Sequence, residues 1–201
     1  SASAGLKRSL ISALVSTSCL KFGDFVLKSG KHSPFYIDLR RLVADPRAMA
    51  LAGQAYASLA EGLGFASLAG IPAAGLPLAT AASLATGKPM IWPRMPAKEH
   101  GTGNRVEGDW KPGQKVLLLD DLITTGASKL EAAEILRGEG LVIEDLVVLI
   151  ERGREGRKDM DKAGIRLHAF LHVRELFEAC EALGLVDPRL RAELEAFVDA
   201  E

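Results

Sequence analysis

Short apolar runs alternate with stretches of helical spacing along most of the chain. The apolar runs predict buried strands at 65–69, 89–92, 115–119, 146–150 and 166–171. Apolar residues repeating every three or four positions predict helices at 46–62, 76–86, 127–138, 173–182 and 188–198. Strands that alternate with helices in this way predict an α/β fold built on a doubly wound parallel sheet.

The first forty residues have a different pattern. Apolar residues at helical spacing predict a first helix from Leu6 to about Ser18, and short strands are predicted at 22–27 and 35–39. The turn between these strands is too short to hold a helix, so the strands should be antiparallel. We therefore expect a single domain, 1–201, in which a small N-terminal helix and hood (about 1–40) covers an α/β core (about 41–201).

The strand at 115–119 leads into two adjacent carboxylates, Asp120 and Asp121, and then into a turn of small residues at 124–128. Such a turn at a helix N-terminus suits a phosphate, because backbone N–H groups and the helix dipole favour an anion there and Gly126 allows its close approach. The acidic pair repels phosphate and suits ribose hydroxyls or a hydrated Mg²⁺ instead. The pattern therefore predicts a sugar phosphate that carries a metal.

The segment 94–108 has no apolar period and contains four Gly or Pro residues between 96 and 108. A long polar loop in a compact domain is typical of a lid. Its basic residues would reach toward a polyphosphate, and they are Arg94, Lys98, His100 and Arg105. The alternative is a solvated hairpin tip.

Composition narrows the class of protein. The 201 residues carry a net charge of −1, which gives no basic field for a nucleic acid. The two cysteines, Cys19 and Cys180, form no CxxC pair, which favours a reducing, cytoplasmic setting. The uncharged stretch 62–87 is long enough to suggest a membrane span, but Pro72 and Pro77 would break such a helix, so no membrane partner is expected.

The strand, acidic pair and turn at 116–128 closely resemble the phosphoribosyl pyrophosphate loop of the type I phosphoribosyltransferases. The segment 22–40, the lid, and Glu151-Arg152 resemble the orotate phosphoribosyltransferases, and the runs 36–40 and 75–80 look most like the transferase half of UMP synthases. The resemblance spans about 6 to 182. It implies the type I phosphoribosyltransferase fold, with the hood over the carboxyl edge of the sheet.

The resemblance also implies a role for each matching residue. Those in contact with phosphoribosyl pyrophosphate would be Lys28, Arg94, Lys98, His100, Asp120, Asp121, Thr124, Thr125, Gly126, Ala127 and Ser128. Those in contact with orotate would be Tyr36, Ile37, Thr124 and Arg152. Lys98, His100, Asp120 and Asp121 would be catalytic. Mg²⁺ would be held mainly by substrate oxygens and water, with no direct protein ligand.

The implied reaction transfers the phosphoribosyl group to N1 of orotate, giving orotidine 5′-phosphate and pyrophosphate in pyrimidine biosynthesis, in a homodimer with shared active sites. Two alternatives stay open, a transferase for another nucleobase and a non-catalytic sensor of phosphoribosyl pyrophosphate. Ala74 and Met95 stand where the family often has lysine. The missing cation at Met95 could be replaced by Arg105, or Met95 could pack as an apolar filler.

Overall fold

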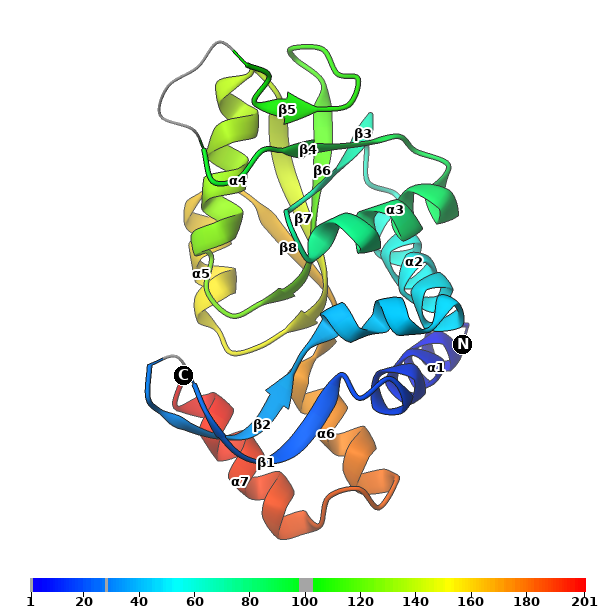
Figure 1. Cartoon of the computed structure of the whole chain (residues 1–201), viewed down its shortest axis with the longest axis vertical. Coiled ribbons are helices and arrows are strands. Elements are labelled where there is room, and N and C mark those ends of the chain that lie inside the picture. Colours follow the sequence, from blue (N-terminus) through cyan, green and yellow to red (C-terminus); the bar gives the residue numbers. More distant parts are fainter. Residues whose placement is uncertain (1, 28, 98–102) are drawn as a thin grey trace.

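A computed structural model describes residues 2–27, 29–97 and 103–201 of the chain (Figure 1). Its helices are α1 (Ala2–Ser16), a 3-10 helix η1 (Leu39–Ala44), α2 (Pro46–Ala60), α3 (Gly75–Thr86), α4 (Ala127–Gly138), α5 (Glu155–Lys162), α6 (Val173–Ala182) and α7 (Pro188–Asp199). Its strands are β1 (Leu20–Val26), β2 (His32–Ile37), β3 (Ser67–Gly70), β4 (Met90–Pro93), β5 (Val106–Glu107), β6 (Lys115–Ile123), β7 (Val142–Glu151) and β8 (Arg166–His172).

The described strands beyond the first forty residues form one sheet in the order β5-β4-β3-β6-β7-β8. The five strands from β4 to β8 in that order are parallel, and β5 pairs with β4 in the antiparallel direction. The chain runs outward from β3 to β4, then returns to β6 and continues through β7 to β8. The direction of winding therefore reverses between β3 and β6, and a ligand crevice is expected at the carboxyl ends of these two strands.

Helices cover both faces of this sheet, as a doubly wound fold requires. On one face α2 and α3 pack against alternate residues of the central strands, among them Leu117 and Leu119. On the other face α4 and α5 pack against Val116 and Leu118 (Figure 1). Both faces of β6 are thus buried, which is why its sequence is continuously apolar. The predicted α/β doubly wound architecture is confirmed.

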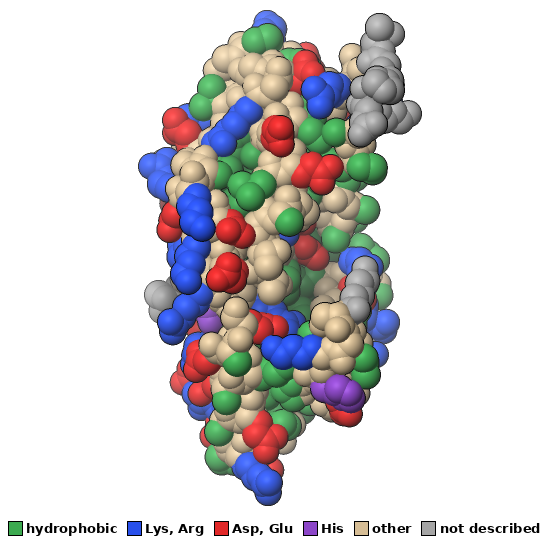
Figure 2. All heavy atoms as spheres, turned by 90° about the vertical axis from the view of Figure 1, so that its left-hand side faces the viewer, with side chains coloured by type: hydrophobic (Ala, Val, Ile, Leu, Met, Phe, Trp, Pro, Cys, Tyr) green, Lys and Arg blue, Asp and Glu red, His purple; other side chains and the backbone are tan. Residues whose placement is uncertain are grey.

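The N-terminal segment folds as predicted into a helix and an antiparallel pair, β1 with β2. This hood is also joined by the end of the chain, because α7 lies against β2 (Figure 1). Phe35 of β2 packs edge-on against Phe177 of α6 at 5.0 Å and Phe197 of α7 at 6.0 Å, measured between ring centroids. The surface is hollowed where this lower lobe meets the sheet (Figure 2).

Three predicted elements differ from the structure. The strand predicted to end at 119 continues as β6 to Ile123, and the strand predicted to start at 146 begins as β7 at Val142. The charged segment after β7, where the apolar pattern predicts no helix, contains α5, whose buried residues are only Gly156 and Met160. So small an apolar face gives too few apolar positions for a helical period. No described helix has the length and apolarity needed to cross a membrane.

Candidate active site

The loop after β3 and the end of β6 meet at the reversal point of the sheet. Gly75, the first residue of α3, lies so close to β6 that a Cβ there would be 3.1 Å from Asp120 Oδ1 and 3.1 Å from the Leu119 carbonyl oxygen. A side chain here would require these neighbours to move by a few tenths of an ångström, so glycine suits this close approach. The sequence predicts that the acidic pair follows the strand. In the structure the pair lies within the strand, since Asp120 still pairs with Val148 of β7.

Asp120 is buried and has a partner within the protein, while its predicted contact with the ribose stays a prediction. It is 5% exposed, and its Oδ2 lies 2.9 Å from the ammonium nitrogen of Lys129. That ammonium also donates to the Leu122 carbonyl at 2.8 Å, and the Tyr56 hydroxyl donates to the Asp120 carbonyl at 2.7 Å. Asp120 is thus the centre of a buried polar cluster that joins β6, α2 and α4.

Burial raises the pKa of the Asp120 carboxyl from 3.8 to about 7, because the charged form is poorly solvated there. The neighbouring Lys129 ammonium acts in the opposite direction and favours the carboxylate, while the charge of Asp121 raises the pKa further. Burial also raises the pKa of the Tyr56 hydroxyl well above its ordinary value. The ionisation of Asp120 is therefore controlled mainly by burial and by one buried cation.

Asp121, in contrast, faces a cavity. The cavity of about 280 Å³ brings the end of β2, the start of η1 and the loop before α3 to the acidic pair. It is lined by Ile37, Asp38, Leu39, Arg40, Ala74, Asp121 and Leu122. Two residues predicted for different parts of the ligand, Ile37 for the base and Asp121 for the ribose, thus line the same space. A small neutral side chain at Ala74 leaves room beside them.

The turn that follows β6 presents backbone N–H groups at the start of α4, where an anion is favoured. Thr125, Ala127 and Ser128 are exposed there, as a phosphate-binding turn requires. Gly126 is different, because it is buried and its N–H donates to Asp159 Oδ2 of α5 at 2.9 Å. A Cβ on Gly126 would lie 2.5 Å from Asp159 Cβ, so glycine is needed here for packing against α5. Packing against α5 is thus by itself a reason for glycine at this position.

Three of the four residues predicted for the base lie on the hood and just after β7, and the fourth, Thr124, is half-buried in the turn after β6. Tyr36 is exposed on β2, with its ring 5.8 Å from that of Phe25, and Ile37 is half-buried. Arg152 follows β7, and its guanidinium lies over the Phe35 ring at 4.4 Å. The carboxylate of Glu201 holds this guanidinium through two hydrogen bonds, of 2.9 and 2.5 Å.

The predicted lid begins at the edge of the sheet. Arg94 pairs with Glu107 of β5 and is directed along this edge, and the described contacts do not connect it with the acidic pair. Met95 packs against the hydrophobic core beneath α4. The Arg105 guanidinium lies near Gly138, at the opposite end of α4 from the phosphate turn, so it does not replace a cation beside Arg94 in this conformation. Lys28, Lys98 and His100 lie outside the described residues.

A resident metal site is not formed by the residues that the structure describes, since no group of three or more His, Cys, Asp or Glu side chains is placed to hold an ion. The half-buried Asp121 carboxylate borders the cavity. One carboxylate beside substrate oxygens is the usual way in which proteins hold Mg²⁺ with a phosphorylated ligand. The site thus fits an ion that arrives with its substrate.

Sequence reasoning missed two residues of this region. Lys129 lies in the first turn of the predicted helix 127–138, directly after the phosphate turn. A lysine at this position is a signal for a partner of an aspartate in the preceding strand. Glu201 lies 49 residues from Arg152, and no pattern in the sequence joins them. Contacts between distant segments have no local signal.

Comparison with known proteins gives close relatives over most of the chain. No protein-family model matches. The orotate phosphoribosyltransferase of Pyrococcus furiosus is 40% identical over 176 residues, which cover 87% of this chain and 97% of the relative.

Two solved structures are also similar. The structure of Leishmania donovani UMP synthase has a TM-score of 0.85 at 38% identity, over 94% of this chain and 41% of that chain. The crystal structure of orotate phosphoribosyltransferase from Aeropyrum pernix has a TM-score of 0.73 at 30% identity, over 87% of this chain and 99% of that chain. The chain therefore matches monofunctional relatives over nearly their whole length and one part of the longer UMP synthase.

Proposed function

The chain belongs to the orotate phosphoribosyltransferase family, and we propose the residues through which it performs the reaction of that family. It is a pentosyltransferase with the type I phosphoribosyltransferase fold, and it joins orotate to phosphoribosyl pyrophosphate to give orotidine 5′-phosphate in pyrimidine biosynthesis. The observation that carries the assignment of roles is the cavity in which Ile37, Ala74 and Asp121 come together near the end of β6.

In the proposed site, Asp121 binds the ribose hydroxyls and Asp120 supports it from within the fold. The 5-phosphate is held by backbone and hydroxyl groups of Thr125, Gly126, Ala127 and Ser128. Phosphoribosyl pyrophosphate is further bound by Lys28, Arg94, Lys98, His100 and Thr124. Orotate is bound by Tyr36, Ile37, Thr124 and Arg152. The exposure of the phosphate turn and the cavity beside Asp121 support this assignment.

The chemistry requires little from a protein base. Orotate N1 attacks the ribose C1, the C1–O bond to pyrophosphate breaks with its electron pair leaving on pyrophosphate, and the N1 proton passes to water or to a pyrophosphate oxygen. Since the substrates and water can take up that proton, catalysis depends on positioning the two substrates and stabilising the leaving group. Lys98 and His100 of the lid are proposed to contact that leaving group. Mg²⁺ is proposed to enter with the substrate, beside Asp121, where it neutralises part of the pyrophosphate charge.

Pyrophosphate release from phosphoribosyl pyrophosphate tests this function. We expect release that depends on orotate and on Mg²⁺, with no release when adenine, hypoxanthine or uracil replaces orotate. Release with one of those bases would favour a transferase for another nucleobase. Tight binding of phosphoribosyl pyrophosphate without release with any base would favour a sensor.

We also propose a homodimer, in which the outer side of η1, α2 and α3 is the contact. A groove of about 800 Å³ lies there, and its described lining carries no charged side chain. Leu84 and Val43 on this groove are 84% and 57% exposed. A self-complementary apolar patch of this kind suits a second copy of the chain. Leu84→Glu should convert the dimer to a monomer in light scattering, and an unchanged mass would contradict the proposed contact.

The proposed dimer is also expected to share its active sites. Mixing the inactive variants Lys98→Ala and Asp121→Asn should restore part of the activity if the lid of one chain serves its partner. No recovery after demonstrated exchange of chains would mean that each lid serves its own subunit. We further propose one domain over 1–201 and a cytoplasmic setting, in which the buried Cys19 and Cys180 stay reduced.

A further inference from the structure

The fork of Arg152 already holds a carboxylate. Its Nε donates to Glu201 Oε2 at 2.9 Å and its Nη2 donates to Glu201 Oε1 at 2.5 Å. The two side chains are only 12% and 16% exposed. Two parallel N–H···O bonds to one carboxylate are the strongest way in which a guanidinium binds an anion. Arg152 is thus fully engaged along the edge that a planar carboxylate ligand would use.

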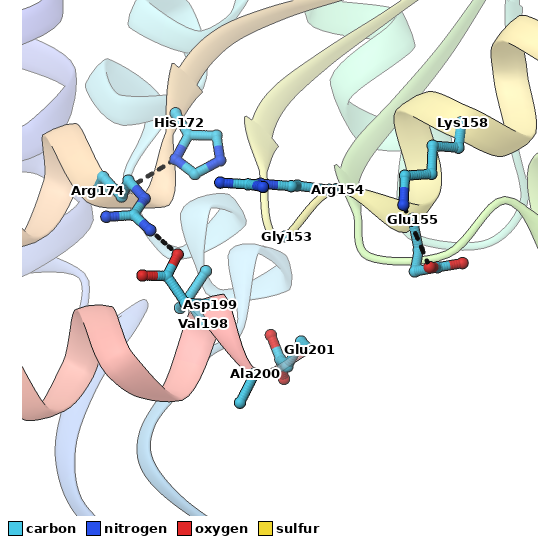
Figure 3. Close-up of a pocket in the computed structure, with 10 residues that line it drawn as sticks. All are labelled: Gly153, Arg154, Glu155, Lys158, His172, Arg174, Val198, Asp199, Ala200 and Glu201. Atoms are coloured by element: carbon cyan, nitrogen blue, oxygen red, sulfur yellow. Dashed lines mark hydrogen bonds and ion pairs between the residues drawn. The ribbon is translucent and has the colours of Figure 1, made fainter.

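Glu201 is brought there by a firmly packed helix. Leu194 and Val198 of α7 are buried, and the Phe197 ring stands at 90° to the Phe35 ring, 6.0 Å away. Just before Glu201, Asp199 pairs with Arg174 of α6 (Figure 3). The end of α7 therefore lies across the base edge of the site, while the last residues beyond its final buried side chain remain at the surface.

Orotate carries a carboxylate on its pyrimidine ring, and the proposed function assigns Arg152 to this ligand. The Nε–Nη2 edge of Arg152 does not bind two carboxylates bidentately at once, so a carboxylate ligand that takes this edge requires Glu201 to leave it. Resting on that function, we propose that Glu201 is a built-in competitor of orotate. Its carboxylate occupies Arg152 in the absence of the base, leaves when orotate binds, and so sets the affinity of the enzyme for bases that carry a carboxylate.

The Glu201 side chain, once displaced from Arg152, has a second site that it can occupy. Glu201 also lines a cavity of about 350 Å³, which Figure 3 shows between the end of α7 and the start of α5. Arg154 and Lys158 lie on its wall. Among the described residues no carboxylate lies within 4.0 Å of the Arg154 guanidinium, and Lys158 meets Glu155 only at 4.0 Å. These cations would receive the carboxylate, so exchange leaves neither charge without a partner.

If the contact between Glu201 and Arg152 were only structural, removing Glu201 would change the affinity for orotate in the opposite direction. If Glu201 only held Arg152 in the orientation that orotate needs, its removal would weaken the binding of orotate. If Glu201 competes, its removal strengthens that binding, because the apparent dissociation constant equals the intrinsic one divided by the fraction of sites that are open. The direction of the change therefore separates the two roles.

The test measures binding of orotidine 5′-phosphate and of uridine 5′-phosphate to the full chain by titration calorimetry. The two nucleotides differ by the base carboxylate alone. We expect Glu201→Ala to tighten orotidine 5′-phosphate about tenfold, for a closed state that is favoured by about ten to one, and to leave uridine 5′-phosphate unchanged. Glu201→Gln should lie between Glu201→Ala and the wild type. Glu193→Ala on the same helix, which breaks an exposed pair with Arg189, is the matched control and should bind as the wild type does.

Unchanged or weaker binding of orotidine 5′-phosphate by Glu201→Ala would overturn the proposal. Equal tightening of both nucleotides would also overturn it, because the effect would then not concern the carboxylate. The wild-type chain could transfer the phosphoribosyl group to orotate and yet bind the two nucleotides equally. Arg152 would then not recognise the carboxylate, and the inference would be wrong. A wild-type chain that releases no pyrophosphate with orotate would instead contradict the proposed function itself.

Discussion

The phosphate turn and the base edge of the site are held in different ways. At the phosphate turn, the buried pair of Asp120 with Lys129 joins β6 to α4, and both residues lie within ten positions of each other in the sequence. At the base edge, Arg152 is held by Phe35 of the hood and by Glu201 at the end of α7. One region is a local unit inside the core, and the other is assembled at the surface from three distant segments.

This difference has consequences for what each region does. A buried ion pair is costly to separate, because each charge would lose its partner in a poorly solvated setting. It therefore suits a part of the site that keeps one conformation. The pair of Arg152 with Glu201 is less deeply buried, with side chains 12% and 16% exposed against 8% and 7% for Lys129 and Asp120, and it has further cations beside it. Its separation should therefore cost less. The base edge is thus the part of the site suited to exchange one carboxylate for another.

The sharpest test of the local unit separates the two acids. Asp121→Asn should lower kcat/KM by more than about a hundredfold, through lost charged hydrogen bonds to ribose, while the free energy of unfolding changes by less than about 0.5 kcal/mol. Asp120→Ala should instead destabilise the fold by about 3 kcal/mol, because Lys129 stays buried without the side-chain oxygen that it contacts. Urea unfolding and steady-state kinetics measure both. Equal behaviour of the two variants would contradict the distinction.

The contrast between the regions also explains what the sequence could predict. The acidic pair and the phosphate turn follow from local patterns of apolar, acidic and small residues between 115 and 138, and the doubly wound fold follows from the alternation of strands and helices along the chain. The inward direction of Asp120 could not be predicted, since it depends on where β6 ends and on Lys129. The partner of Arg152 could not be predicted either, because it depends on the docking of α7 onto the hood. Helix α5 could not be predicted, because it has too few apolar residues to show a helical period.

A pH profile tests the buried cation. Lys129→Met should raise the pKa of Asp120 further, because Lys129 opposes the rise that burial causes. If transfer needs the carboxylate, the acid limb of kcat/KM moves to higher pH, by about one unit or more.

The same shift fixes the sign of the pH dependence of stability. A folded pKa of about 7 against 3.8 means that the folded state keeps a proton which the unfolded chain has lost. The free energy of unfolding contributed by this group therefore falls as pH rises between these values. Urea unfolding across that range measures the fall, which should continue to higher pH in Lys129→Met. Identical profiles for the two proteins would mean that Lys129 does not control Asp120.

A smaller effect is expected when the contact between the phosphate turn and α5 is overfilled. Gly126→Ala places a methyl group 2.5 Å from Asp159 Cβ, and overpacking of this kind costs about 1–3 kcal/mol. Gly138→Ala is the matched control at the other end of α4, where the nearest atom outside the helix is 4.0 Å away. It should stabilise the protein by about 0.5–1 kcal/mol. Thermal unfolding of the two variants should therefore shift in opposite directions, and a stabilised Gly126→Ala would contradict the packing role.

The smallest effects are expected at the lid, where the sequence left two readings of Met95. If catalysis lacked a cation at position 95 and Arg105 replaced it, Met95→Lys would raise activity and Arg105→Ala would lower it. The structure favours the other reading, because Met95 packs on the core and Arg105 lies at the far end of α4 from the phosphate turn. We therefore expect Met95→Lys to leave kcat and both KM values within about twofold and to destabilise the fold by about 1 kcal/mol, the lower range for placing a polar group in apolar surroundings. Arg105→Ala should leave the kinetics unchanged. Steady-state kinetics of both variants with thermal unfolding of Met95→Lys decide the matter, since a gain of activity in Met95→Lys would mean that this side chain leaves the core and joins the pyrophosphate site during turnover.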